Sequence, residues 1–187
     1  MDAIAALYHR RAIRDYTEMP VETEQINFLI AAAAQAPNAM DRQHWAFVVI
    51  RDRGLLDRLS SQAKTHLLAS MDPHSDIATL REHLASPQFN MFYNAPVLIV
   101  ICATDTDAFT QQDCCLAAAN LMIAAQASGL GTCWIGFAEA WLNHAEAKKE
   151  LGIPAHYRPV APIILGHPRV IPTPPPRHRP DVTWIEP

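Results

Sequence analysis

The sequence predicts a single α+β domain in which a mixed or antiparallel sheet lies between helices. The chain has 187 residues, half of them hydrophobic, and its short apolar runs alternate with segments of helical periodicity. A chain of this length can bury one substantial core. Neither an internal repeat nor an interdomain linker divides it, so residues 1–187 are expected to form one domain.

Four short runs predict the strands of the sheet. Residues 45–50 and 97–103 are apolar, rich in β-branched side chains and bounded by polar residues or proline, which is typical of buried strands. Residues 132–137 and 160–165 have the same character, although glycine or proline interrupts each run.

Helical segments separate these runs. Helices are expected over 22–36, which stops at Pro37, and over 54–70, 76–84 and 138–151. The stretch 111–128 is apolar on nearly all sides and is stopped by Gly129, which predicts a long central helix buried on most faces. A second subunit would supply part of that cover, so we expect a homodimer.

The composition excludes several classes of function. Fifteen Lys and Arg against 19 Asp and Glu give a net charge of −4, so no nucleic-acid partner is expected. The start of the chain lacks the features of a signal peptide, and the longest apolar stretch is too short to span a bilayer, so a cytoplasmic protein without a membrane partner is expected. The four cysteines are interpreted as buried thiols, and the nine histidines form no metal-binding motif, so no metal site is expected.

Two pairs of arginines raise the question of an anion. Arg10 and Arg14 are four residues apart and share a face on a helix, which suits either an anion-binding site or an ordinary solvated surface. Arg177 and Arg179 lie in residues 172–180, PTPPPRHRP, where the prolines predict polyproline II geometry. This extended arm, residues 172–187, is interpreted as a docking peptide or a linker.

The usual catalytic motifs are absent from the sequence. It contains no G-x-G-x-x-G after a strand, no G-x-x-x-x-G-K-[ST] and no G-x-S-x-G. Adjacent Cys114 and Cys115 in an apolar helix argue against an exposed, reactive thiol. A chain so poor in reactive side chains is expected to rely on a cofactor.

Four separated motifs resemble those of the nitroreductase family of flavin mononucleotide (FMN) enzymes. They are RRAIRDYT, then AAAAQAPNAMDRQHWAFVVI (31–50), then NLMIAAQASGLGTCWIGF (120–137), and last LGIP (151–154) followed by PVAPIILGHPR (159–169). The resemblance covers essentially the whole chain. It implies a nitroreductase-like fold, a C-terminal tail that embraces the partner subunit, and a homodimer with FMN at its interface.

The resemblance also implies which residues hold the cofactor. Those matching the arginine motif and the late basic pair would contact the FMN phosphate and ribityl chain: Arg10, Arg11, Ala12, Arg14, Arg177 and Arg179. Those matching the second motif would contact the flavin: Pro37, Asn38, Ala39, Asp41 and Gln43. Trp134, Ile135 and Gly136 match the strand near flavin N5, although core packing is the competing interpretation of Trp134. Arg14, or a lysine such as Lys64, would place positive charge near flavin N1.

The sequence departs from the family pattern at four positions. Ala12 replaces a serine, Asn38 a serine, Asp41 an asparagine and His44 a proline. Asp41 would disfavour the anionic reduced flavin unless it points away or pairs with Arg42 or Arg14. No catalytic residue is assigned, although His44 is the best titratable candidate.

The expected function is therefore that of an FMN-dependent oxidoreductase. NADH or NADPH would give hydride to flavin N5 and leave, and a small electron-poor acceptor such as a nitroaromatic or a quinone would replace it in a ping-pong cycle. The alternatives are a flavin-dependent oxidase, dehydrogenase or dehalogenase of the same fold, a non-catalytic FMN-binding or redox-sensing protein, and an interaction protein that uses its tail. Phe89, Phe92 and Tyr93 would cover the substrate pocket or attach a surface loop to the core.

Overall fold

Four antiparallel strands form one sheet at the centre of the computed structural model, which describes residues 2–71 and 78–186. The strand order is β1-β2-β4-β3. The strands are β1 (Trp45–Ile50), β2 (Val97–Ala103), β3 (Gly131–Trp134) and β4 (Arg158–Gly166). Every residue of β2 is buried, as expected for an apolar strand covered on both faces.

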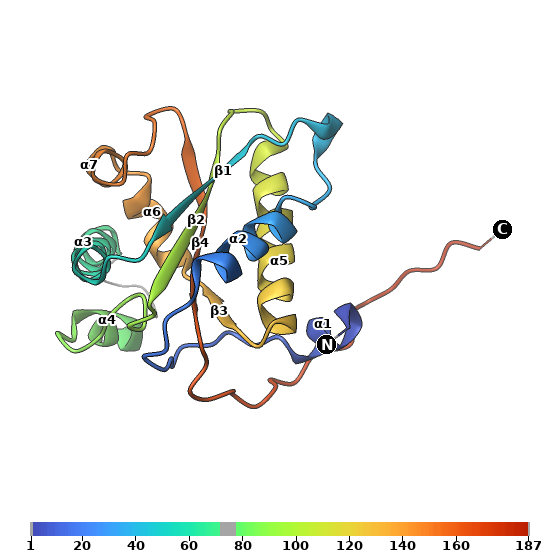
Figure 1. Ribbon diagram of the computed structural model, residues 1–187, viewed down its shortest axis with the longest axis horizontal. Helices are drawn as coiled ribbons and strands as arrows, with labels where there is room; N and C mark the ends of the chain where they lie inside the picture. Colours follow the sequence, from blue (N-terminus) through green and yellow to red (C-terminus); the bar gives the residue numbers. More distant parts are fainter. Residues whose placement is uncertain (1, 72–77, 187) are drawn as a thin grey trace.

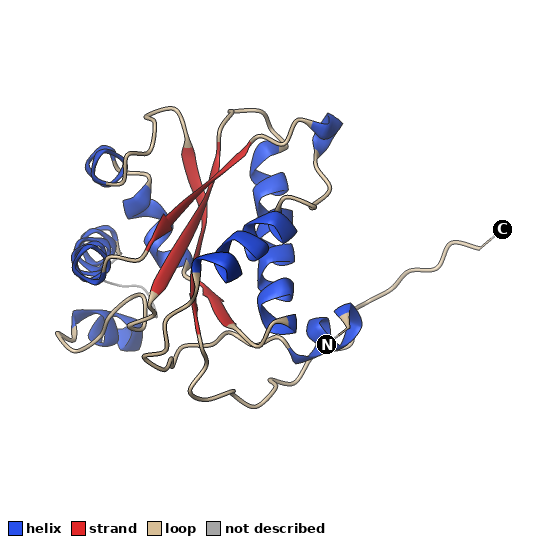
Figure 2. Cartoon of the chain, viewed as in Figure 1, coloured by secondary structure: helices blue, strands red, loops and turns tan. Residues whose placement is uncertain are grey.

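Helices cover both faces of the sheet (Figures 1 and 2). One hydrophobic cluster packs α2 (Thr23–Ala33) and α5 (Thr110–Ala127) on one face. A second cluster occupies the opposite face, where α3 (Arg53–Ser70), α4 (Ala78–Ala85), α6 (Glu139–Leu142) and α7 (Ala145–Glu150) lie. The short α1 (Ala3–His9) contacts α5. The prediction of an α+β fold with a central sheet between helices is confirmed.

The long helix α5 packs against the sheet, α2 and α1, and of its residues Gln111, Gln112 and Leu116 are exposed. Its buried residues are Thr110, Asp113, Cys114, Ala117, Ala118, Leu121 and Ala125. Leu116 is 43 % exposed. The helix ends where Gly129 adopts a φ of 76° and the Leu130 amide donates to the Ala125 carbonyl at 2.8 Å, a helix-ending turn that suits glycine.

Two expected elements differ from those observed. The expected helix over 138–151 is two short helices, because His144 adopts an extended backbone and begins α7. The Asn143 side chain fixes the break by donating to the carbonyls of Glu139 and Pro159. The expected strand over 132–137 ends at Trp134, and a 3₁₀ turn begins at Gly136.

Proline is tolerated in the interior strand β4 because the ladder is irregular there. The register with β2 shifts between Ile101 and Cys102, next to Pro159 and Pro162. Pro162 still accepts a hydrogen bond from the Ile135 amide at 2.8 Å through its carbonyl. This contact directs the chain out of β3 into the turn that begins at Gly136.

The remaining helices match their predicted segments closely. The 22–36 segment forms α2, with a capping box between Glu22 and Gln25. The 54–70 segment forms α3, whose first turn is capped by the Asp52 carboxylate. Of the segment 76–84, residues 76 and 77 lie outside the described residues and the rest belongs to α4. Within the described ranges, no helix combines the length and apolarity needed to cross a membrane.

Candidate functional site

A cavity of about 450 Å³ brings together three parts of the chain that are far apart in sequence. Arg14 comes from the segment after α1. Residues 133–137 come from the end of β3 and the turn that follows it. The third part contributes His83, Leu84, Phe89, Met91 and Tyr93. We call this space the Trp134 cavity.

Gly136 lines the Trp134 cavity, and nothing in the chain itself requires a glycine there. A Cβ atom built at Gly136 would meet no protein atom within 4 Å, and Gly136 is not among the residues with positive φ. Gly131 differs, because a Cβ there would approach the Ile13 side chain to 2.7 Å. A bound molecule lying against the backbone would explain the glycine at position 136.

Arg14 places a permanent positive charge at the cavity wall. Its guanidinium carbon lies 5.7 Å from the centre of the Tyr93 ring, which it faces as a cation over an aromatic ring. Burial raises the pKa of the neighbouring Cys133 thiol, and the charges of Arg14 and Arg10 oppose this effect. Cys133 is therefore a neutral thiol at pH 7, and burial likewise raises the pKa of Cys102 and of Cys114 to about 12.

The arginine motif runs beside the edge strand β3. Ala12 forms a bridge with Thr132, and the Ile13 amide donates to the Thr132 carbonyl at 2.9 Å. Arg11 donates to the carbonyls of Tyr8 and Arg10, both at 2.8 Å, so its guanidinium caps backbone of its own segment. Both contacts use the same guanidinium nitrogen, and the expectation that Arg11 contacts the FMN phosphate stays a prediction.

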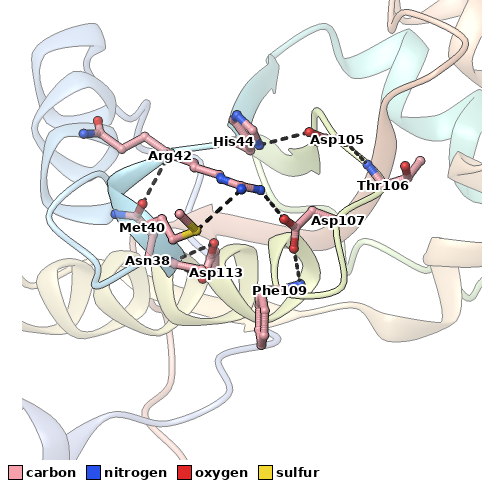
Figure 3. Close-up of polar contacts among 11 residues, drawn as sticks. Asn38, Met40, Arg42, His44, Asp105, Thr106, Asp107, Phe109 and Asp113 are labelled. Carbon is pink, nitrogen blue, oxygen red and sulfur yellow. Dashed lines mark hydrogen bonds and ion pairs between the residues drawn. The ribbon is translucent and has the colours of Figure 1, made fainter.

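The loop that contains Pro37 and Ala39 has an unusual backbone held by hydrogen bonds (Figure 3). Met40, Asp41 and Gln43 all have φ near 55°, which is uncommon for residues with a side chain. The Asn38 side chain accepts from the Gln43 amide at 2.9 Å, and both oxygens of buried Asp113 lie 3.2 Å from the Ala39 amide.

Two side-chain contacts attach the same loop to the segment before α5. Arg42 forms an ion pair with Asp107, and His44 Nδ1 lies 3.3 Å from the Asp105 carboxylate (Figure 3). Asp41 accepts from the Gln43 side chain at 2.9 Å. Among the ion pairs of the described residues, Asp41 is paired with neither Arg42 nor Arg14.

Within one chain, this loop and the arginine motif lie at opposite ends of α5. The loop contacts Asp113 in the first turn of the helix, whereas Ala12 pairs with Thr132, which follows its last turn. A helix of 18 residues is about 25 Å long. None of Pro37, Asn38, Ala39, Asp41 and Gln43 therefore lines the Trp134 cavity of its own chain.

The C-terminal arm extends away from the rest of the chain (Figure 1). Residues 169–186 are exposed throughout, Arg177 and Arg179 among them. The expectation that Arg177 and Arg179 contact the FMN phosphate together with Arg10 and Arg14 stays a prediction. Val182, Trp184 and Ile185 are also exposed, and Trp184 is 81 % accessible.

The segment before β2 supplies cavity residues for which the sequence offered no motif. Phe89 and Tyr93 line the cavity, as expected for residues covering a pocket, whereas Phe92 is only 1 % exposed and belongs to the core. The Lys64 ammonium donates to the carbonyls of Ser86 and Phe89 at 3.2 and 2.7 Å, so it holds this segment and does not line the cavity. Phe137 and Met91 were missed, and only their proximity to expected site residues could have indicated them.

Comparison with known proteins decides the family. A model of the Nitroreductase family matches residues 7–167. The chain belongs to this family. A Methanothermobacter thermautotrophicus protein named as an NADH dehydrogenase/NAD(P)H nitroreductase is 29 % identical to this member over 90 % of the present chain and 78 % of its own.

Two solved nitroreductases with bound FMN share the fold of this family member along the full length of both chains. The protein from Bacteroides fragilis superposes with a TM-score of 0.85 at 22 % identity. The protein from Desulfitobacterium hafniense superposes with a TM-score of 0.80 at 26 % identity. The predicted nitroreductase-like fold is therefore confirmed.

The Trp134 cavity of this nitroreductase family member suits a flat, electron-accepting cofactor. It offers aromatic and apolar walls, a backbone free of Cβ at Gly136, and the fixed charge of Arg14. Trp134 packs in the core beside α5 and also lines the cavity, so both interpretations of it apply. Among residues 2–71 and 78–186, no group of three or more His, Cys, Asp or Glu is placed to hold a metal ion.

Proposed function

We propose that this nitroreductase family member binds FMN in the Trp134 cavity and transfers hydride from NAD(P)H to a small, electron-poor organic acceptor. The chain is an FMN-dependent NAD(P)H oxidoreductase by its family. The observation that supports the position of the cofactor is Gly136, a glycine at the cavity wall that neither backbone conformation nor protein packing requires. FMN supplies the hydride-accepting centre, and the chain supplies binding and electrostatics.

The charges at the cavity suit the reduced state of such a cofactor. Arg14 would lie beside the flavin and stabilise negative charge on its pyrimidine ring. Arg10 would hold the phosphate, because a guanidinium offers two parallel donors to phosphate oxygens. Ala12, in place of the serine of the family, removes one hydroxyl donor from this phosphate site.

His44 lies outside the cavity of its own chain, paired with Asp105, and takes no part in the transfer there.

A second copy of the chain would complete the site. The loop from Pro37 to Gln43 is some 25 Å from the arginine motif of its own chain, judged by the length of α5. In a homodimer this loop and the C-terminal arm would approach the cavity of the partner. The apolar side chains that a dimer would cover are exposed: Ile4, Leu7, Tyr8, Phe28, Phe109, Leu116 and Trp184. Exposed apolar side chains in such number are typical of a protein–protein interface.

An absorbance titration tests the proposal. Purified protein is titrated with FMN and then, without air, with NADH or NADPH, while the spectrum between roughly 300 and 550 nm is followed. Flavin bands that bind stoichiometrically and then bleach are expected. Protein that stays colourless at saturating FMN would refute the cofactor assignment, and bound flavin that neither nicotinamide bleaches would make the protein a passive flavin carrier.

A further inference from the structure

A second cavity of about 770 Å³ adjoins the Trp134 cavity. Arg14, Phe89 and Tyr93 line both spaces. The second cavity lies at the end of the sheet where β1 finishes and β2 begins, because Arg51 and Arg53 follow β1 and Pro96 precedes β2. We call it the arginine cavity, because Arg14, Arg51, Arg53 and Arg169 all contribute to its wall.

The arginine cavity carries an excess of positive charge. Four arginines are opposed in its lining by two carboxylates, those of Asp15 and Glu18. Asp15 is already paired with Arg169 at 3.2 Å. Among the described residues, neither Arg14 nor Arg51 forms an ion pair, so their charges are available to an anion.

Polar contacts hold two of these guanidinium groups in place, and Arg53 also forms an ion pair with Asp57 at 3.5 Å. Arg51 donates to the Thr23 hydroxyl at 3.0 Å and to the Val21 carbonyl at 2.9 Å. Arg53 donates to the carbonyl of Asn94 at 2.9 Å and to its side-chain oxygen at 2.7 Å. Each guanidinium has five N–H donors, so both keep donors for a further acceptor after these contacts. The arrangement fixes two cations at low ordering cost.

The wall between the two cavities is held in a constrained conformation. Tyr93 and Asn94 have φ of 52° and 55°, which is sparsely populated for residues with side chains. The double contact from Arg53 to Asn94 holds this turn, and Arg14 stacks over the Tyr93 ring. The Tyr93 ring, which lines both cavities, therefore lies against the positive charge of Arg14.

We propose that the arginine cavity binds the anionic group of a molecule that reacts in the Trp134 cavity. The reaction in the Trp134 cavity rests on the proposed function, whereas the recognition of an anion by the arginine cavity does not depend on it. The shared chemistry is a carboxylate or a phosphate attached to an aromatic ring system, because guanidinium forks bind both. The anion would belong to the electron acceptor, as a carboxylate, or to the nicotinamide donor, as the additional phosphate of NADPH.

Pairs of probes that differ in one charge test the inference by calorimetry on the FMN-loaded protein. One pair is 4-nitrobenzoate and 4-nitrobenzyl alcohol, and the other is NADP⁺ and NAD⁺. The wild type is expected to prefer the more anionic member of at least one pair. Arg51→Met should reduce that preference about fivefold, and Glu18→Gln should increase it about twofold. The pair that responds identifies the source of the anion.

Arg58→Met is the matched control, since Arg58 pairs with Glu150 on the outer side of α3 and does not line the arginine cavity. It should leave both preferences unchanged. Preferences that Arg51→Met and Glu18→Gln leave as in the wild type, for both pairs, would overturn the inference. Failure of the proposed function has a different signature, namely bound FMN that NAD(P)H does not bleach, whatever the probe preferences are.

Discussion

At the scale of single residues, a substitution at Gly136 is expected to weaken cofactor binding without changing the stability of the fold. A methyl group at Gly136 meets no protein atom within 4 Å, and Gly136 lines the Trp134 cavity, where we propose that the flavin binds. Gly136→Ala should therefore leave the free energy of unfolding of the apoprotein within about 0.5 kcal/mol of wild type. Its affinity for FMN should fall about tenfold, because the added carbon occupies the contact surface of the flavin. Thermal denaturation and a fluorescence titration with FMN measure the two effects.

The control is Gly131, the glycine at the start of β3. Gly131→Ala would place its Cβ at 2.7 Å from the Ile13 side chain, so it should cost about 1–3 kcal/mol of stability. A Gly136→Ala protein that binds FMN as tightly as wild type would contradict the placement of the flavin against this backbone.

The buried thiols make stability depend on pH in the alkaline range. Burial raises the pKa of Cys102 and of Cys114 from 9.0 to about 12. Above pH 9 the unfolded chain releases these protons while the folded chain retains them, so the free energy of unfolding should fall between pH 9 and 12. Each thiol contributes a slope of about 1.4 kcal/mol per pH unit there, and its full stabilisation is present below pH 9.

Urea unfolding at several pH values under reducing conditions measures this slope. The Cys102→Ala variant should show a slope that is smaller by the contribution of one thiol, whatever its stability at pH 8. Parallel curves for the variant and the wild type would show that Cys102 titrates normally in the folded state.

At the scale of elements, Asp113 of α5 holds the loop with the unusual backbone. Its carboxylate accepts from the Ala39 amide, and three residues of the loop have positive φ. Asp113→Ala removes this acceptor and should cost about 1–2 kcal/mol. Hydrogen exchange at the amides of residues 38–43 should accelerate, while Asp113→Asn, which keeps an acceptor oxygen, should preserve most of their protection. Unchanged exchange in Asp113→Ala would show that Arg42 and His44 suffice to hold the loop.

The sequence predicted those elements whose hydrophobic pattern dominates their environment. The strands β1 and β2 and the helices α3 and α5 agree with prediction to within one residue at each end. The break between α6 and α7 could not be predicted, because Asn143 makes it by reaching the Pro159 carbonyl, 16 positions further along the chain. The strand β3 is shorter than its apolar run, since the turn at Gly136 follows from contacts with β4 and not from local composition.

At the scale of the whole molecule, the separation of the site residues carries the most information. The sequence motifs group the loop residues with the arginines because both resemble FMN contacts. A motif does not show how far apart its residues lie in the folded chain. The structure places the two groups at opposite ends of α5. In the proposed homodimer, two antiparallel copies would unite the loop of one chain with the arginines of the other.

A variant on the exposed side of α5 tests this assembly. Leu116 is a large apolar side chain of α5 that is 43 % exposed, and a charge in a subunit interface is strongly unfavourable. Leu116→Arg should therefore shift the protein from dimer to monomer and abolish FMN binding together with it, as measured by sedimentation and by absorbance. Ser61→Arg, at an exposed position of α3 in the opposite layer, should change neither.

Removal of residues 172–187 should weaken both dimerisation and FMN binding, because the arm carries Arg177, Arg179 and exposed Trp184. A monomer that retains FMN would show that Arg10, Arg14 and the Trp134 cavity hold the cofactor without the loop of a second chain.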